Sequence, residues 1–112
     1  MTNEEINIAI AESLGWTYIS QRCMWGLPPN AIDDGTERCL RHFPNYAADL
    51  NACHEFVKTL SDDQRREYIL RLCLGDDWRK GEINMQSCIY AESALPKDRC
   101  EAYLRTIGQW KE

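Results

Sequence analysis

Residues 44–60, PNYAADLNACHEFVKTL, decide how the rest of the chain is interpreted. Their large apolar side chains recur at steps of four, three, four and three, at Tyr46, Leu50, Cys53, Val57 and Leu60. That spacing places all of them on one stripe of a helix. The stretch therefore predicts an amphipathic helix that buries one face.

The same stretch carries polar residues that resemble a metal or catalytic cluster. His54 and Glu55 begin an H-E-x-x-H pattern, but Lys58 stands where the second zinc-binding histidine is required. Asp49 and His54 lie on opposite flanks of the helix, and adjacent helical residues diverge by about 100°. We predict that Asp49 and His54 anchor the helix by hydrogen bonds to neighbouring segments and that no metal binds there. A ligand-binding role is the alternative.

Length and composition predict a single folded domain over residues 1–112. The chain is 44% hydrophobic and 28% charged, which is typical of a globular protein. Its formal net charge of −5 argues against binding to nucleic-acid backbones, which requires a basic surface. A local group of arginines would still suit a small acidic ligand.

The sequence also predicts a cytoplasmic protein with reduced thiols. The first fifteen residues carry acidic groups where a secretory signal is basic, and no stretch approaches the ~20 apolar residues of a membrane span. The six cysteines include no C-x-x-C pair, so we expect them to be mostly buried and not disulfide-bonded.

Caps and breakers define the remaining elements. Thr2 and Glu5 form a capping box before a helix that ends at Gly15, and Ser61 and Gln64 form another. Residues 16–20, 37–42 and 83–90 are expected to be strands, and a last helix runs from Pro96 to Gly108. The order α-β-β-α-α-β-α predicts the α+β class. In it, a small mixed or antiparallel sheet is covered by helices on both faces, as a three-layer α/β/α sandwich.

Three segments give a family resemblance. NYAADLNACHE at residues 45–55, AYLRTIGQW at 102–110 and MTNEEINIAIAESLGW at 1–16 together resemble the phage ABA sandwich domain family. The matched segments lie at both ends and in the middle of the chain, and residues 61–95 contribute no motif. The resemblance implies a phage or prophage protein with a three-layer fold, and it assigns no role to any single residue.

The functional expectation is a binding protein and not an enzyme. The two histidines have no catalytic motif around them, and neither a cofactor nor a metal is expected. By analogy with small phage proteins that sequester nucleotide signals, we expect a homo-oligomer. It would counter host defence (an anti-defence function) by sequestering a host immune signal of the cyclic nucleotide or cyclic ADP-ribose type. The expected ligand-binding residues are Arg105, Trp25, Arg22, Arg38 and Arg41.

Two of these residues have assigned roles. Arg105 leaves the apolar stripe of the last helix and is expected to bind phosphate, while Trp25, placed in the loop 25–29, is expected to stack on a base. The alternative function is an acidic inhibitor that binds a host nuclease or CRISPR effector through Asp33-Asp34, Asp62-Asp63 and Asp76-Asp77.

Overall fold

A computed structural model describes residues 1–22, 24–29, 40–81 and 85–111, apart from the side chains of residues 86–88 and 90. The elements in chain order are α1 (Asn3–Ser13), β1 (Thr17–Ser20), β2 (Trp25–Leu27), β3 (Arg41–His42), α2 (Leu50–Val57), α3 (Asp62–Leu74), the 3-10 helix η1 (Gly75–Lys80), α4 (Met85–Ser93) and α5 (Pro96–Thr106). None of the described helices combines the length and the apolar character needed to cross a membrane.

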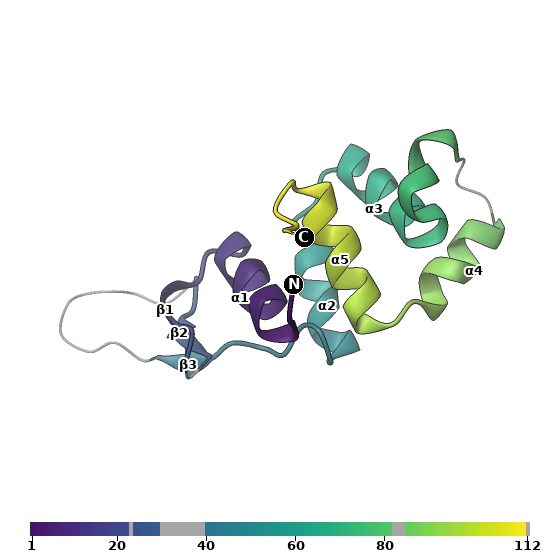
Figure 1. The fold of residues 1–112 in the computed structure, drawn as a ribbon. Helices are drawn as coiled ribbons and strands as arrows, with labels where there is room; N and C mark the ends of the chain where they lie inside the picture. The colour runs from purple at the N-terminus through teal and green to yellow at the C-terminus, as the bar shows by residue number, and fades with distance from the viewer. Residues whose placement is uncertain (23, 30–39, 82–84, 112) are drawn as a thin grey trace.

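The α+β class and the small antiparallel sheet are confirmed. The strand order is β1-β2-β3, with Trp25 opposite His42 and Gly26 opposite Arg41. The sheet lies at one end of the molecule, α1 separates it from α2 and α5, and α3 and α4 follow beyond α5 (Figure 1). The helices are thus distributed unevenly: α1 contacts the sheet, and the others pack mainly on one another.

Two glycines end helices in the same way. Gly15 after α1 and Gly108 after α5 have φ angles of 95° and 77°, a left-handed conformation that glycine adopts without a steric penalty. The N–H of the next residue then bonds back into the helix, from Trp16 to the Ala11 carbonyl at 3.0 Å and from Gln109 to that of Leu104 at 2.8 Å. These are Schellman turns. The capping boxes expected at Thr2 and Ser61 are also present, so these helix ends follow from the sequence.

The helix within residues 44–60 is shorter than its apolar spacing predicts. Asp49 is its N-cap and accepts a hydrogen bond from the Asn51 N–H at 2.9 Å, so Tyr46 lies before the helix. Because the helix begins only at Leu50, the predicted stripe is wrong in part: Leu50 is 42% exposed, whereas Phe56 is fully buried. The expected bond from Asp49 to a neighbouring segment is wrong, because Asp49 caps its own helix, and His54 lies exposed on the surface of α2.

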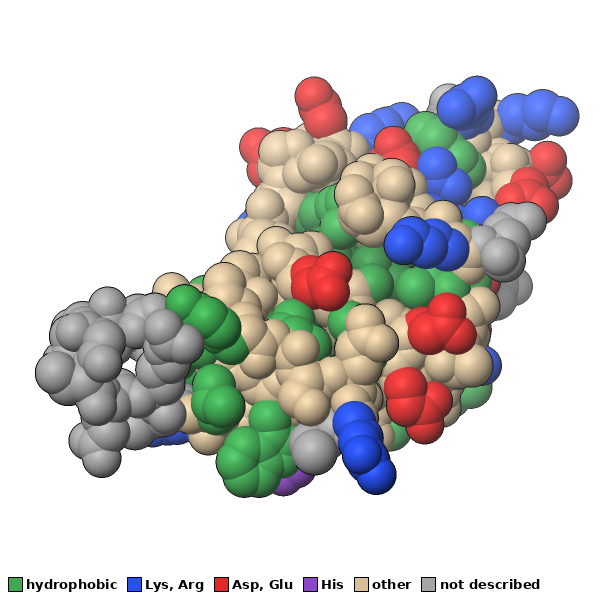
Figure 2. Space-filling view, turned by 60° about the vertical axis from the view of Figure 1, so that its left-hand side comes forward, with side chains coloured by type: hydrophobic (Ala, Val, Ile, Leu, Met, Phe, Trp, Pro, Cys, Tyr) green, Lys and Arg blue, Asp and Glu red, His purple; other side chains and the backbone are tan. Residues whose placement is uncertain are grey.

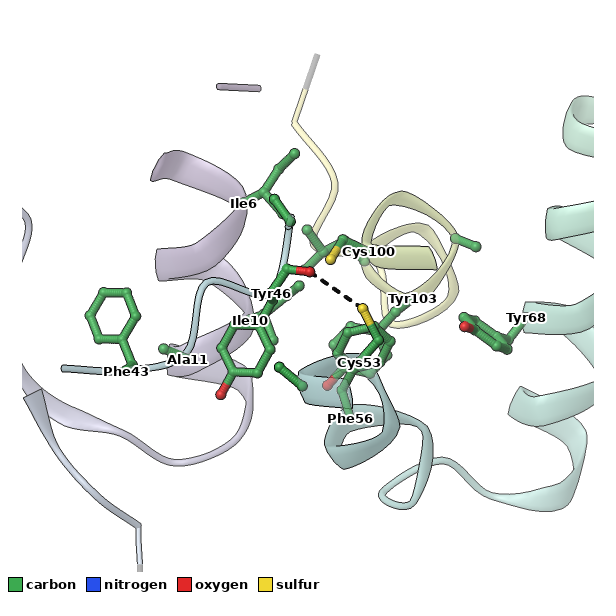
Figure 3. Packing of buried hydrophobic residues seen from close by; sticks show 14 of the residues in the cluster. Ile6, Ile10, Ala11, Phe43, Tyr46, Cys53, Phe56, Tyr68, Cys100 and Tyr103 are labelled. Carbon is green, nitrogen blue, oxygen red and sulfur yellow. Dashed lines mark hydrogen bonds between the residues drawn. The ribbon is translucent and has the colours of Figure 1, made fainter. Parts of the chain in front are cut away.

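Phe56 is the centre of the hydrophobic core (Figure 3). Its ring stacks on Tyr103 of α5, with centroids 4.4 Å apart and planes inclined by 25°. Tyr46 and Tyr68 contact it at centroid distances of 6.3 and 6.4 Å. One side chain of α2 therefore joins α5, α3 and the segment before α2.

Two thiols complete this core. Cys53 and Cys100 are fully buried, and the Cys53 thiol donates to the Tyr46 carbonyl at 3.3 Å. A hydrogen bond with the Cys53 sulfur and burial together raise the pKa of Cys100. The predicted burial is confirmed for Cys53 and Cys100, whereas Cys73 is only partly buried. Cys23, Cys39 and the side chain of Cys88 lie outside the described part of the chain.

Three expected strands have different outcomes. Of the expected residues 16–20, Thr17–Ser20 form β1, and β3 covers Arg41–His42 of the expected 37–42, of which residues 37–39 are not described. The strand expected over 83–90 is wrong, because Met85–Ser93 is the helix α4. Met85 and Ile89 fit a helical step of four as well as they fit alternation, and the Arg99 side chain donates to the carbonyls of Ala91 and Ala94 at the helix end.

The core assignment predicts unequal costs for two substitutions on one helix. Phe56→Ala removes the buried ring that three tyrosines contact and should lower the free energy of unfolding by about 3–5 kcal/mol. Leu50→Ala removes a partly exposed side chain and should cost less than about 1 kcal/mol. Urea unfolding followed by circular dichroism measures both, and equal losses would contradict the assignment.

Buried tyrosines predict a loss of stability at alkaline pH. Burial raises the pKa of Tyr68 to about 12, against the nearby Arg99 charge, which lowers it. The unfolded chain ionises near pH 10, so this contribution is intact below pH 10 and is lost as the pH rises toward 12. Tyr68→Phe should make the decline of stability between pH 9.5 and 11.5 shallower. At pH 7 it should be nearly neutral, because the Tyr68 hydroxyl has no hydrogen-bond partner among the described residues. An unchanged alkaline slope would refute the explanation.

Candidate functional site

Exposed aromatic side chains gather on the sheet. Trp25 is 39% and Tyr18 is 53% exposed, and Leu40 beside β3 is exposed as well. The Trp25 ring meets His42 of β3 edge to face, with centroids 4.5 Å apart. Figure 2 shows hydrophobic side chains on the surface at this end of the molecule, beside the grey segment. Trp25 therefore lies in a strand and not in the predicted loop, but it is accessible as expected for stacking.

The described residues of this end include two arginines. Between Trp16 and Asn45, Arg22 and Arg41 are the described residues with a full charge, both are exposed, and no carboxylate is among them. Residues 30–39, which include Arg38, Glu37 and the Asp33-Asp34 pair, lie outside the description. Arg41 precedes His42 in the strand, so the two side chains start on opposite faces. Because β3 is an edge strand, the long Arg41 side chain can still reach an anion at that edge.

A groove lies between the start of α1 and the sheet. Its volume is about 340 Å³, and its lining consists of Asn3, Glu4, Asn7, Met24, His42, Phe43 and Asn45. His42 links it to the aromatic surface, because its ring also contacts Trp25. A ligand whose ring lies on Trp25 would thus have the groove beside it.

One buried amide fixes the wall of this groove. The Asn7 side chain is buried, donates to Oδ1 of Asn45 at 2.8 Å and accepts from the Ala47 N–H at 2.9 Å. These bonds tie α1 to the segment that follows β3. The position of Asn45 is therefore set before any ligand arrives.

Backbone strain is concentrated in the same hairpin. Among the described residues, Tyr18 and Met24 are the non-glycine residues with a positive φ, at 51° and 58°. A side chain in that conformation costs of order 1–3 kcal/mol, and such strain is most frequent at functional sites. Met24 lines the groove, so the strain coincides with the candidate site.

Arg105 lies in the last turn of α5, away from the sheet end. Its guanidinium is 3.8 Å from the Glu101 carboxylate and 5.2 Å from the centre of the Trp110 ring. It also lines a cleft of about 350 Å³ between α3 and α5, where the carboxylates of Asp76, Asp98 and Glu101 balance the arginines. Since α1 separates α5 from the sheet, one subunit does not bring Arg105 and Trp25 together (Figure 1).

The acidic doublets have local roles in the helices. Asp62 and Asp63 lie in the first turn of α3, and Asp76 and Asp77 lie in the first turn of η1. Carboxylates there complement the positive end of the helix dipole. Within the described residues, no three His, Cys, Asp or Glu side chains are placed to hold a metal ion.

Comparison with protein-family models, curated proteins and solved structures finds no match for this chain. The resemblance to the phage ABA sandwich domain family remains a prediction from the sequence. The candidate site accordingly rests on its own geometry. The sequence alone does not reveal His42, Met24, Glu4 or Asn45 as site residues, because they converge only when α1 packs beside the sheet.

The contacts of Arg105 predict a structural cost for its removal. Arg105→Ala loses the Trp110 ring contact and a positive charge in the last turn of α5, which should lower the free energy of unfolding by about 0.5–1 kcal/mol. Arg66→Ala, on the exposed surface of α3, is the matched control and should cost less. Equal stability of the two variants in urea would show that the Trp110 contact contributes nothing.

Proposed function

We propose that the protein is a non-enzymatic binding protein that holds a small nucleotide-type ligand at the sheet end. The observation that carries the proposal is the accessible Trp25 ring, which His42 contacts edge to face. Arg41 precedes His42 in the same strand, and Arg22 is a second exposed arginine at this end. An aromatic face binds a nucleobase by stacking, and arginines bind phosphate through paired hydrogen bonds.

The charge distribution favours a small ligand over a nucleic-acid polymer. A polymer requires a basic surface along several phosphates, whereas this chain has a net charge of −5. Arg22 and Arg41 are sufficient for one or two phosphates. Arg38 is a further candidate from the sequence.

Sequestration is the proposed biological use of this binding. By analogy with small phage proteins that sequester nucleotide signals, the ligand would be a host immune signal of the cyclic nucleotide or cyclic ADP-ribose type, and the place of action the host cytoplasm. A homo-oligomer fits this proposal, because Arg105 can contribute to the same ligand only from a second copy of the chain.

A second candidate is binding to another protein. At the opposite end of the molecule, Met85 is 80% exposed, and Ile89 and Leu95 are also exposed. The Asp76-Asp77 pair lies on η1, which like α4 packs on α3. An apolar surface beside carboxylates would suit a basic protein partner, as expected of an acidic inhibitor. Such a complex should weaken steeply with added salt, whereas stacking on Trp25 should be less sensitive.

If the proposal is correct, the Trp25 ring and the Arg41 charge should each contribute to the affinity for nucleotides. Trp25→Ala should weaken the calorimetric affinity for nucleoside monophosphates by about 5- to 150-fold, the value of one base stack, while Trp25→Phe should retain most of it. Arg41→Gln should weaken binding about 10- to 100-fold through the lost charged hydrogen bond.

Arg66→Gln is the matched control for Arg41→Gln, because it removes the same charge from an exposed position on α3. It should leave the affinity unchanged. If none of the mono- and cyclic nucleotides binds to the wild type at millimolar concentration, the nucleotide proposal is wrong.

A further inference from the structure

We infer that the groove between α1 and the sheet selects the base of the nucleotide and prefers guanine, with Glu4 as the specificity residue. This inference rests on the proposed function, since it assigns the base end of the same ligand. The groove begins at His42, whose ring contacts Trp25, and continues to Glu4 at the start of α1. A purine stacked at Trp25 would project one edge into it.

The charges give such a ligand one orientation. Glu4 is the carboxylate in the groove lining, while Arg22 and Arg41 belong to the sheet end outside it. A phosphate is repelled by the carboxylate and attracted by the arginines. The phosphate must therefore lie toward the arginines, and the base toward Glu4.

The polar groups of the groove match one base edge. A carboxylate only accepts hydrogen bonds, and its two oxygens can accept from the adjacent N1–H and N2–H groups of guanine. The Asn45 oxygen already accepts from Asn7, so its amide nitrogen is the group that can donate to the guanine O6. Adenine presents an acceptor at N1 and one donor at N6, so it would leave one carboxylate oxygen facing a lone pair.

The rest of the groove supports this assignment. Met24 and the buried Phe43 supply apolar contacts. Glu5, the neighbouring carboxylate, is engaged with the Thr2 N–H in the capping box at 3.2 Å. Glu4 is therefore the residue to test at this helix start.

The test compares GMP, IMP and AMP by calorimetry on the wild-type protein and on Glu4→Gln. Wild type should bind GMP at least tenfold more tightly than AMP, with IMP between them because it lacks the N2 amino group. Glu4→Gln should weaken GMP about tenfold or more and leave AMP within about twofold. Glu12→Gln, which removes an exposed carboxylate near the other end of the same helix, should change neither affinity.

The outcomes separate this inference from the proposed function. Equal affinities for GMP and AMP, or a GMP affinity that Glu4→Gln does not reduce, would overturn the guanine preference while nucleotide binding stands. Binding of none of the three to folded wild type would overturn both. Circular dichroism of Glu4→Gln and Glu12→Gln should match the wild type, so a loss of GMP affinity cannot be attributed to unfolding.

Discussion

The stacked rings of Phe56 and Tyr103, 4.4 Å apart, are the contact on which the rest of this structure depends. The pair joins α2 to α5, Tyr68 brings α3 against it, and Tyr46 brings in the segment that follows the sheet. Ile6 and Ile10 bury one face of α1 in the same core. Aromatic rings remove large apolar areas from water, and a small domain has few other sources of stability. Four helices and one loop are thus held by a single cluster.

The sheet is attached to that core by fewer contacts. Trp16, placed by the turn at Gly15, packs edge to face on Phe43 with centroids 6.0 Å apart, and Phe43 in turn bonds to the Met24 carbonyl. The hairpin itself contains two strained residues and leaves Trp25 and Tyr18 in contact with solvent. A domain that spends stability in this way is expected to use the region for binding. The helical core therefore supplies the stability, and the exposed sheet end is the part proposed to bind a ligand.

Local signals in the sequence predicted local structure well. The capping boxes at Thr2 and Ser61 and the glycines at positions 15 and 108 define helix ends because each acts within one turn. The predicted core residue Leu50 is exposed, and Phe56 is buried in its place. Asp49 caps α2, so the helix begins only at Leu50 and its buried face differs from the predicted stripe. The groove was not predictable in the same way, since Glu4, His42 and Asn45 are far apart in the sequence and meet only through the packing of α1. Two of the predicted site residues, Trp25 and Arg41, lie on neighbouring strands, whereas Arg105 belongs to another part of the fold.

We propose that the sheet end is the functional surface, and locating a bound nucleotide by NMR tests this proposal. Titration of uniformly ¹⁵N-labelled protein with GMP should shift the indole N–H of Trp25 and the backbone amides of Met24, His42 and Asn45 in a saturable manner. The amides of α4 and the indole of Trp78 should stay in place. Saturable shifts confined to α4 and α5, with the Trp25 indole unmoved, would contradict the account and would place the functional surface at the opposite end of the molecule.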